Sequence, residues 1–280
     1  MKSVEGLPLG MVQFKAPVLA HRRMARDHYL MRLSAPLVAR RALPGQFVHV
    51  RCGKEGSPLL RRPFSLLDVN PKTGTIDFIY KVVGVGTRVL ADVRSGERVD
   101  LLGPLGRPFE FPSHLENADL IGGGVGIPPM VFLGRWLRER GVEVEAFLGA
   151  RTKEWVICVS DFKRLKIPVR IATDDGTLGR RGSVVELLKT VIARRPERPT
   201  KQSYTLYICG PTPMMRAAAN LARQRNLPAQ VSLEERMGCA MGCCMGCVVE
   251  VTTEPVASHA RFQRVCTEGP VFPAEAICWR

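Results

Sequence analysis

The sequence lacks both the long apolar runs of a membrane-spanning chain and the long basic runs of a nucleic-acid-binding one. No stretch of its 280 residues approaches the roughly 18 consecutive apolar residues that a spanning helix needs. The 41 Lys and Arg outnumber the 26 Asp and Glu, but they are scattered, and aromatic residues make up only 6% of the chain. A membrane span and a nucleic-acid partner are therefore not expected. The net charge of +15 suits a solvated basic surface, or one that attracts phosphate-bearing cofactors or an acidic partner.

The nine cysteines are not spread along the chain as a disulfide framework would require, since five of them fall between Cys239 and Cys266. The first residues, Met1 to Gly6, contain no apolar segment of the kind that begins a secretory signal. We therefore expect a cytoplasmic location, where thiols stay reduced and can bind metal.

Three regions of different pattern follow one another along the chain. Short alternating runs separated by Gly and Pro predict an antiparallel barrel or sandwich in the first region, with strands at 28–35, 46–52, 75–83 and 98–102 and a short helix at 87–93. From residue 118 strands and helices alternate, which predicts a parallel sheet with helices on both faces. The last region is rich in Cys and Gly and too small to build much core, so a metal centre is expected to stabilise it. The expected domains are 10–112, 116–233 and 234–280.

The clustered cysteines have the spacing of an iron–sulfur site. Taken together, Cys239, Cys244, Cys247 and Cys266 give C-x4-C-x2-C-x18-C, which is typical of plant-type 2Fe–2S proteins. Glycines at 238, 242 and 246 would let backbone N–H groups approach the sulfurs. The alternative is a structural zinc site, but zinc sites usually show two C-x2-C pairs and this segment has one. Of the remaining cysteines, we interpret Cys243 as a small buried residue beside the cluster, and Cys52 and Cys158 as core residues on strands.

Four further motifs could hold cofactors, and each has an ordinary structural alternative. Arg62-Pro63-Phe64-Ser65 offers a guanidinium for a pyrophosphate and an aromatic ring for a flavin, or it is a surface turn. The segment 79–87 reads as strand, glycines and helix start, which suits a phosphate or a plain strand–turn–helix. Gly122 to Gly126 follow an apolar strand and open a helix, as a nucleotide-binding turn does, or they only allow close packing. Cys209-Gly210-Pro211 also lies at the end of a strand, where open parallel sheets bind ligands, or Cys209 is only a buried strand residue.

In this order, the motifs resemble those of the ferredoxin–NADP+ reductase superfamily and, more narrowly, of the electron-transfer subunits of NAD-dependent dihydroorotate dehydrogenases. The most specific parts are Leu233 to Met237, which lead into the cysteine loop, and Cys266 followed by Gly269 to Phe272. The resemblance covers nearly the whole chain. It implies a β-barrel FAD-binding domain, an α/β NAD-binding domain with a parallel sheet, and a small C-terminal 2Fe–2S cluster domain.

The resemblance also implies a role for each motif. The residues expected to contact FAD are Arg62, Pro63, Phe64, Ser65, Ile79, Tyr80, Lys81, Gly86 and Thr87. Those expected beside NAD are Gly122, Gly124, Gly126, Cys209, Gly210 and Pro211. The cluster ligands would be Cys239, Cys244, Cys247 and Cys266, with Met237 and Met245 shielding the cluster.

The implied function is electron transfer in pyrimidine biosynthesis. An FMN-containing catalytic subunit, in a heterotetramer with two copies of each chain, would oxidise dihydroorotate, and electrons would pass through the 2Fe–2S cluster and FAD to NAD+. No acid–base catalytic residue is expected, because the cofactors carry the chemistry. Two alternatives remain: a related reductase subunit serving a hydrogenase or a ferredoxin-type partner, and a zinc-stabilised binding module without a redox role.

Overall fold

The computed structural model describes residues 11–53, 57–194, 203–252 and 261–279. The chain forms two compact units: the first comprises Met1–Pro108, Glu235–Val248 and Gln263–Pro270, and the second comprises Phe109–Glu234, Val249–Phe262 and Val271–Arg280. The segment Met1 to Gly6, the expected domain start at residue 10, and positions 253–260 and 280 of the expected cluster domain lie outside the described residues. The division into three domains stays a prediction.

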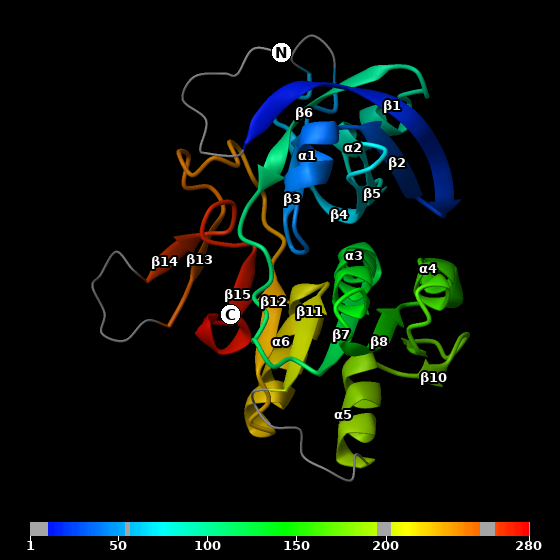
Figure 1. Ribbon diagram of the computed structural model, residues 1–280, viewed down its shortest axis with the longest axis vertical. Helices are drawn as coiled ribbons and strands as arrows, with labels where there is room; N and C mark the ends of the chain where they lie inside the picture. The colour runs from blue at the N-terminus through cyan, green and yellow to red at the C-terminus, as the bar shows by residue number, and fades with distance from the viewer. Residues whose placement is uncertain (1–10, 54–56, 195–202, 253–260, 280) are drawn as a thin grey trace. The chain divides into compact units, whose positions relative to one another are not determined.

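A closed barrel of six strands forms the first unit (Figure 1). Its strands, in the spatial order β1-β2-β5-β4-β3-β6, are β1 (Val12–Ala25), β2 (His28–Ser34), β3 (Phe47–Val50), β4 (Arg62–Asn70), β5 (Thr75–Lys81) and β6 (Arg98–Leu105). Two short helices accompany them, α1 (Pro36–Arg41) and α2 (Val85–Ala91). Phe78 of β5 pairs with Met31 of β2 on one side and Leu66 of β4 on the other, and all three side chains are buried. These inward-facing residues make the barrel core, because alternate side chains of a strand face opposite sides.

Strand β1 closes the barrel, and the sequence patterns did not predict it. Its first half pairs with β6 and its second half with β2, and the register shifts between Val18 and Ala20 and again between Arg23 and Ala25. Such bulges bend a strand and increase its twist, which lets one strand pair on both sides of a closing sheet. The segment His21 to Arg23 is polar, so its strand character depends on this pairing rather than on hydrophobic alternation.

The second unit is built around a seven-stranded sheet with the order β10-β9-β8-β7-β11-β12-β15. All pairs are parallel except β12 with β15, which is antiparallel. The strands are β7 (Asn117–Gly123), β8 (Glu143–Ala150), β9 (Val169–Thr173), β10 (Arg180–Arg181), β11 (Tyr204–Cys209), β12 (Ala229–Ser232) and β15 (Val271–Pro273). The predicted parallel sheet is confirmed, with one antiparallel strand added at its edge.

Four helices connect the parallel strands: α3 (Ile127–Arg138), α4 (Val159–Arg164), α5 (Val184–Arg194) and α6 (Thr212–Gln224). Helix α3 contacts α4, and α5 contacts α6, as expected for helices on two faces of the sheet. Ser183 caps the start of α5, because the N–H of Glu186 donates to its Oγ at 3.2 Å. No helix in the described ranges is long and apolar enough to cross a membrane.

Two expectations about isolated cysteines were wrong in part. Cys52 and Cys158 are buried, as expected, but neither lies in a strand. Cys52 follows β3, whose pairing ends at Val50, and its thiol faces the Val50 carbonyl at 3.7 Å. Cys158 has a φ of +65° and directly precedes α4. That left-handed conformation cannot occur within a strand.

A buried hydrogen bond between β11 and β7 yields a stability prediction. The hydroxyl of Tyr204 donates to Asp119 Oδ2 at 2.5 Å, and both residues are almost fully buried. Tyr204→Phe should lower the free energy of unfolding by about 2 kcal/mol, because it removes a donor from a buried carboxyl group. Urea unfolding followed by circular dichroism measures this loss.

Tyr207→Phe is the matched control on the same strand. Tyr207 is also fully buried, but its hydroxyl donates to the Glu110 carbonyl at a longer 3.2 Å. Tyr207→Phe should therefore lower the free energy of unfolding by less than Tyr204→Phe does. An equal or larger decrease would contradict the role given to the Asp119 contact.

Candidate functional site

The structure brings the four predicted cluster cysteines together within the first unit. The N–H groups of Met241 and Cys244 both donate to the sulfur of Cys239 at 3.4 Å. The thiols of Cys247 and Cys266 are hydrogen-bonded to each other, and Cys266 also interacts electrostatically with Cys239. Contacts therefore link all four cysteines, although 18 residues separate the third from the fourth.

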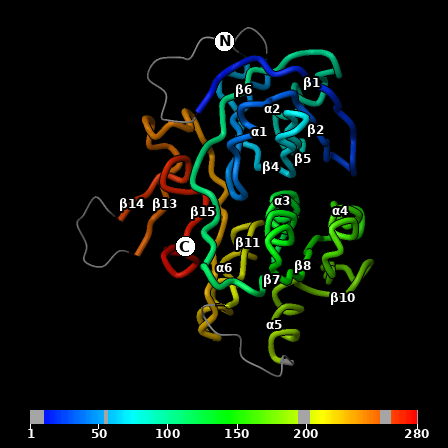
Figure 2. The backbone as a smooth tube through the Cα atoms, viewed as in Figure 1, coloured from blue at the N-terminus to red at the C-terminus, as the bar shows by residue number. Residues whose placement is uncertain are grey.

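The two segments that carry these cysteines lie side by side. The cysteine loop, residues 235–248, leads into β13 (Val248–Glu250), and the return segment, residues 263–270, begins in β14 (Phe262–Arg264). β13 and β14 form a two-stranded sheet, seen in orange to red in Figure 2. Beyond it, the N–H of Val265 donates to the carbonyl of Cys247 at 2.9 Å. This pairing delivers Cys266 to the loop just past the end of β14.

The thiols differ in how readily they lose a proton. Burial raises the pKa of Cys239, but the N–H donors of Met241, Cys244 and Cys243 outweigh it and lower that pKa to about 7. Burial, and then the neighbouring Cys247, raise the pKa of the Cys266 thiol to about 12. Backbone N–H donors of this kind stabilise thiolate sulfur, and iron would replace the proton on the more buried thiols.

The arrangement fits a centre with two metal atoms better than a single ion. A structural zinc ion needs four ligands within about 2.0–2.3 Å of one point. In the part of the chain that the structure describes, no three Cys, His, Asp or Glu side chains are placed to hold one ion. The thiols instead interact in two pairs, Cys239 with Cys244 and Cys247 with Cys266. Two pairs of thiols suit a bridged pair of irons, so the residues fit the predicted cluster.

The interpretation of Cys243 as a buried residue was wrong. Its side chain is exposed, and its thiol approaches only the Met241 carbonyl, at 4.0 Å. Cys244 is also exposed, and it differs from Cys243 in that its thiol is hydrogen-bonded to Cys239. Of the two methionines expected to shield the cluster, Met237 is buried but Met245 is half exposed.

The residues predicted to contact FAD occupy neighbouring elements of the barrel. Arg62 to Ser65 begin β4, Ile79 to Lys81 end the adjacent β5, and Gly86 and Thr87 lie in α2. The Arg62 guanidinium packs on Gly86, where an added Cβ would come within 3.0 Å of its Nε. Gly86 therefore leaves room for the positive group.

The surroundings of Arg62 suit a ligand that is both apolar and anionic. Its Nη1 donates to the carbonyls of Leu60 at 2.6 Å and Arg61 at 3.0 Å, which fixes the guanidinium. The side chains of Leu59, Val83 and Val85 on the adjoining segments are 75%, 78% and 61% exposed. Exposed aliphatic groups beside a fixed cation fit a flavin ring with its pyrophosphate.

Several of the expected FAD contacts also have structural roles. The ring of Phe64 stacks on Phe78 at 4.9 Å and is mostly buried. The Tyr80 hydroxyl bonds to His21 Nε2 at 2.9 Å, while His21 Nδ1 faces the Val93 carbonyl at 2.6 Å. Because a carbonyl only accepts, Nδ1 carries the hydrogen when the ring is neutral, and Tyr80 donates to Nε2.

Thr87 is likewise engaged within its own turn. Its hydroxyl oxygen accepts from the N–H groups of Val83 and Gly84 at 2.9 and 3.1 Å, which stabilises the start of α2. Direct contacts of Phe64, Tyr80 and Thr87 with FAD stay predictions.

The two turns predicted for the nicotinamide nucleotide pack against each other. Gly122, next to the last residue of β7, lies beside Cys209 at the end of β11, since the two residues are register partners. A Cβ on Gly126 would lie 2.3 Å from the Cys209 carbonyl oxygen, so only glycine allows this approach. From β7 the chain passes through α3 to β8, the neighbour of β7 on one side. Strands β11 and β12 extend the sheet on the other side of β7. The turns thus flank the switch point of the sheet, where open α/β sheets bind ligands.

A neighbouring pair of turns offers groups that could select between NAD and NADP. The N–H of Asp174, after β9, donates to the Ala150 carbonyl at the end of β8, at 3.1 Å. The Asp175 carboxylate accepts from the N–H of Thr177 at 3.0 Å and from its hydroxyl at 2.7 Å, and these bonds lower the Asp175 pKa. Asp174 is exposed and directly follows β9.

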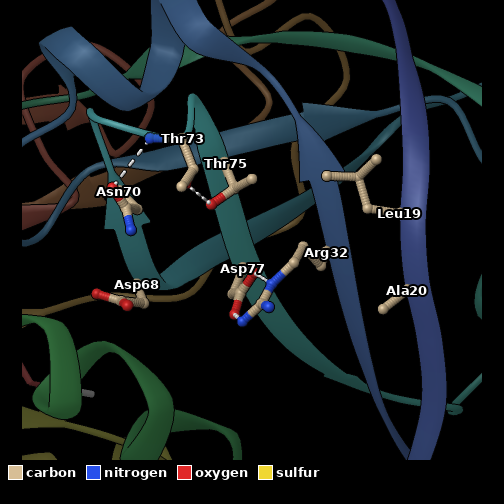
Figure 3. A pocket seen from close by; sticks show the side chains of 8 residues that line it. All are labelled: Leu19, Ala20, Arg32, Asp68, Asn70, Thr73, Thr75 and Asp77. Carbon is tan, nitrogen blue, oxygen red and sulfur yellow. Dashed lines mark hydrogen bonds and ion pairs between the residues drawn. The ribbon is translucent and has the colours of Figure 1, made fainter.

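A polar cavity that no sequence motif indicated lies on the outside of the barrel. Its volume is about 410 Å³, and Figure 3 shows its lining: Leu19, Ala20, Arg32, Asp68, Asn70, Thr73, Thr75 and Asp77. Arg32 donates to both oxygens of Asp77, at 2.7 and 2.6 Å. Asp68 and Asp77 are register partners on β4 and β5, so Arg32 offsets the repulsion between two opposed carboxylates. None of the predicted cofactor residues lines the cavity.

Two regions of the chain match known protein families. Residues 234–278 match the iron–sulfur cluster binding domain of dihydroorotate dehydrogenase B, and residues 120–220 match the oxidoreductase NAD-binding domain. An electron transfer subunit of dihydroorotate dehydrogenase B (NAD(+)) from Desulforamulus reducens is 41% identical, over 95% of this chain and 98% of that protein. Its counterpart from Shouchella clausii is 40% identical over the same shares.

A solved structure of NADH-dependent reduced ferredoxin-NADP oxidoreductase, studied for flavin-based electron bifurcation, superimposes with a TM-score of 0.81. It is 31% identical, over 94% of this chain and 90% of that one. The predicted barrel, parallel-sheet and cluster regions, and the resemblance drawn from the motifs, are confirmed. The chain belongs to the family of electron transfer subunits of NAD(+)-dependent dihydroorotate dehydrogenase B, within the fold of the ferredoxin–NADP+ reductases.

Proposed function

We propose that this chain passes electrons from dihydroorotate oxidation to NAD+ in pyrimidine biosynthesis. Its partner would be an FMN-containing catalytic subunit, with two copies of each chain in a heterotetramer. A cytoplasmic location belongs to the same proposal, since thiols that hold a cluster stay reduced there. The observation that carries it is the meeting of Cys239, Cys244, Cys247 and Cys266 in a chain 41% identical to an electron transfer subunit.

The chain's own residues would bind and orient. The four thiolates would hold the cluster, with N–H groups directed at the sulfur of Cys239. Arg62 would neutralise the flavin pyrophosphate, and the turns at Gly126 and Gly210 would admit the nucleotide. When bound, the flavin and the 2Fe–2S cluster supply the conversion between single electrons and the electron pair that NAD+ takes. None of these roles requires a side chain to exchange a proton, so we expect no indispensable acid–base residue.

A second candidate is a related reductase subunit with another partner. It is favoured by one observation, the TM-score of 0.81 with a reductase that is named for ferredoxin and NADP. The two candidates share the cofactor-binding elements and differ in the protein that delivers electrons.

Anaerobic co-expression with a dihydroorotate-oxidising subunit discriminates between them. The two chains should co-purify, and dihydroorotate should bleach the visible absorbance of flavin and cluster in the complex but not in this chain alone. Failure of dihydroorotate to reduce a complex that contains FAD, FMN and iron would contradict the proposed function and favour the second candidate.

The neighbours Cys243 and Cys244 provide a matched test of the cluster ligands. Cys244→Ser should lose most of the iron and the visible absorbance, because the cluster would lack one of its four thiolates. Cys243→Ser should keep both: the two side chains are both exposed, but the Cys243 thiol approaches the Met241 carbonyl, whereas the Cys244 thiol is hydrogen-bonded to Cys239. Iron and sulfide per chain measure the outcome, and equal iron contents in the two variants would contradict the assignment of Cys244. A wild-type chain that holds zinc but no iron would support the binding-module alternative instead.

Asp174 provides a test of nucleotide choice. A carboxylate at this position accepts hydrogen bonds from ribose hydroxyls and repels a 2′-phosphate. Asp174→Ser should therefore reduce the preference for NADH over NADPH, measured as a ratio of kcat/KM, by roughly tenfold, which corresponds to about 1.4 kcal/mol. Asp175→Ser is the control, because Asp175 is engaged by Thr177. A larger effect of Asp175→Ser would contradict the choice of Asp174.

A further inference from the structure

One arginine of the return segment connects the fourth cysteine to the loop that holds the other three. The Nη1 of Arg264 donates to the carbonyl of Gly242, in the middle of the cysteine loop, at 3.0 Å. Its Nε donates to Glu268 Oε2 at 2.9 Å, and its Nη2 donates to the other oxygen of the same carboxylate. The backbone N–H of Arg264 also donates to Glu268, at 2.8 Å. The guanidinium is therefore fixed on one side by Glu268 and faces the loop with the other.

Gly242 is the receiving residue, and both of its backbone groups are engaged. Its carbonyl accepts from Arg264, and its N–H donates to the sulfur of Cys266. Its φ is +86°, and an added Cβ would lie 3.0 Å from Arg264 Nη1 and 3.1 Å from Thr267 Cγ2. Because that conformation and that space both require glycine, Arg264 can approach closely and hold the loop at the residue whose N–H faces Cys266.

The charge of Arg264 acts on the same thiols that its hydrogen bonds position. Its guanidinium interacts electrostatically with Cys266 and with Cys247. The side chain is about one-third exposed, so bulk water screens part of this interaction. A reduced cluster carries one more negative charge than an oxidised one, so a fixed cation nearby stabilises the reduced form and raises the reduction potential.

We propose that Arg264 is a positioning residue of the cluster: it holds the cysteine loop at Gly242, the residue whose N–H faces Cys266, and its charge raises the cluster's reduction potential. Glu268 fixes the guanidinium and partly offsets that charge. This role goes beyond ligand identity, since Arg264 contributes no ligand atom.

The two partners make the proposal testable by the sign of a shift. In the full-length chain with FAD and cluster bound, Arg264→Met should lower the midpoint potential, because it removes the cation and leaves Glu268. Glu268→Gln should raise it, because the cation stays and the offsetting carboxylate is lost. The potential is measured by an anaerobic redox titration followed by electron paramagnetic resonance, whose signal also reports the surroundings of the irons.

Two further variants control for charge and for geometry. Arg261→Met removes the same charge just before β14, where Arg261 pairs with Glu250, and should leave the potential unchanged. Arg264→Lys keeps the charge but cannot form the same fork, so its potential should lie between those of the wild type and Arg264→Met. Arg264→Met should also lose iron to a chelator roughly tenfold faster than the wild type.

Shifts of opposite sign for Arg264→Met and Glu268→Gln, with Arg261→Met unchanged, support the proposal. No shift in Arg264→Met, or shifts of the same sign in both, overturns it. If Arg264→Met retains no cluster, the midpoint potentials of Glu268→Gln and Arg264→Lys decide. A raised potential in Glu268→Gln with a lowered one in Arg264→Lys supports the proposal, and any other result overturns it. This inference rests on the proposed cluster site. A wild-type chain without iron would contradict the site itself. Unchanged potentials in variants that hold the cluster would contradict only the role of Arg264.

Discussion

The return of residues 263–270 to the cysteine loop is the contact on which the redox site depends. Three cysteines lie within nine residues of one another, and local turns can place them. The fourth, Cys266, must be carried back over a β13–β14 sheet and held there by hydrogen bonds, such as the one between Val265 and Cys247. Without that return the loop would present only three of the four predicted ligand thiols, which is one too few for a closed site.

In the seven-stranded sheet, Gly126 and Cys209 are likewise far apart in the sequence and are brought together by the fold. Parallel strands end at one edge, so two turns far apart in the sequence meet there without any dedicated contact. The absence of a side chain at Gly126 then lets the two backbones approach closely. In both places glycine leaves room for a close approach, at Gly242 for the Arg264 guanidinium and at Gly126 for the Cys209 carbonyl.

The sequence predicted those elements whose signal is local. Hydrophobic strands followed by glycine turns gave β7 and β11, and the cysteine spacing indicated the cluster loop. Strand β1 was missed because its polar half is a strand only through its partners. Cys243 was wrongly expected to be buried because its exposure is not encoded in the spacing of cysteines. Arg264 was missed for a related reason. An arginine two residues before a cysteine indicates no role by itself, and its contact with the Gly242 carbonyl is visible only in the structure.

Both edges of the seven-stranded sheet end in strands that are poor templates for further pairing. At one edge β15 covers β12 with only three residues, and at the other β10 consists of the exposed pair Arg180 and Arg181. Open strand edges recruit other chains, and short or charged edge strands prevent this. Strand β15, which follows residues 263–270, thus also covers the backbone groups of β12. A chain shortened before Val271 would expose an edge strand that is prone to aggregation.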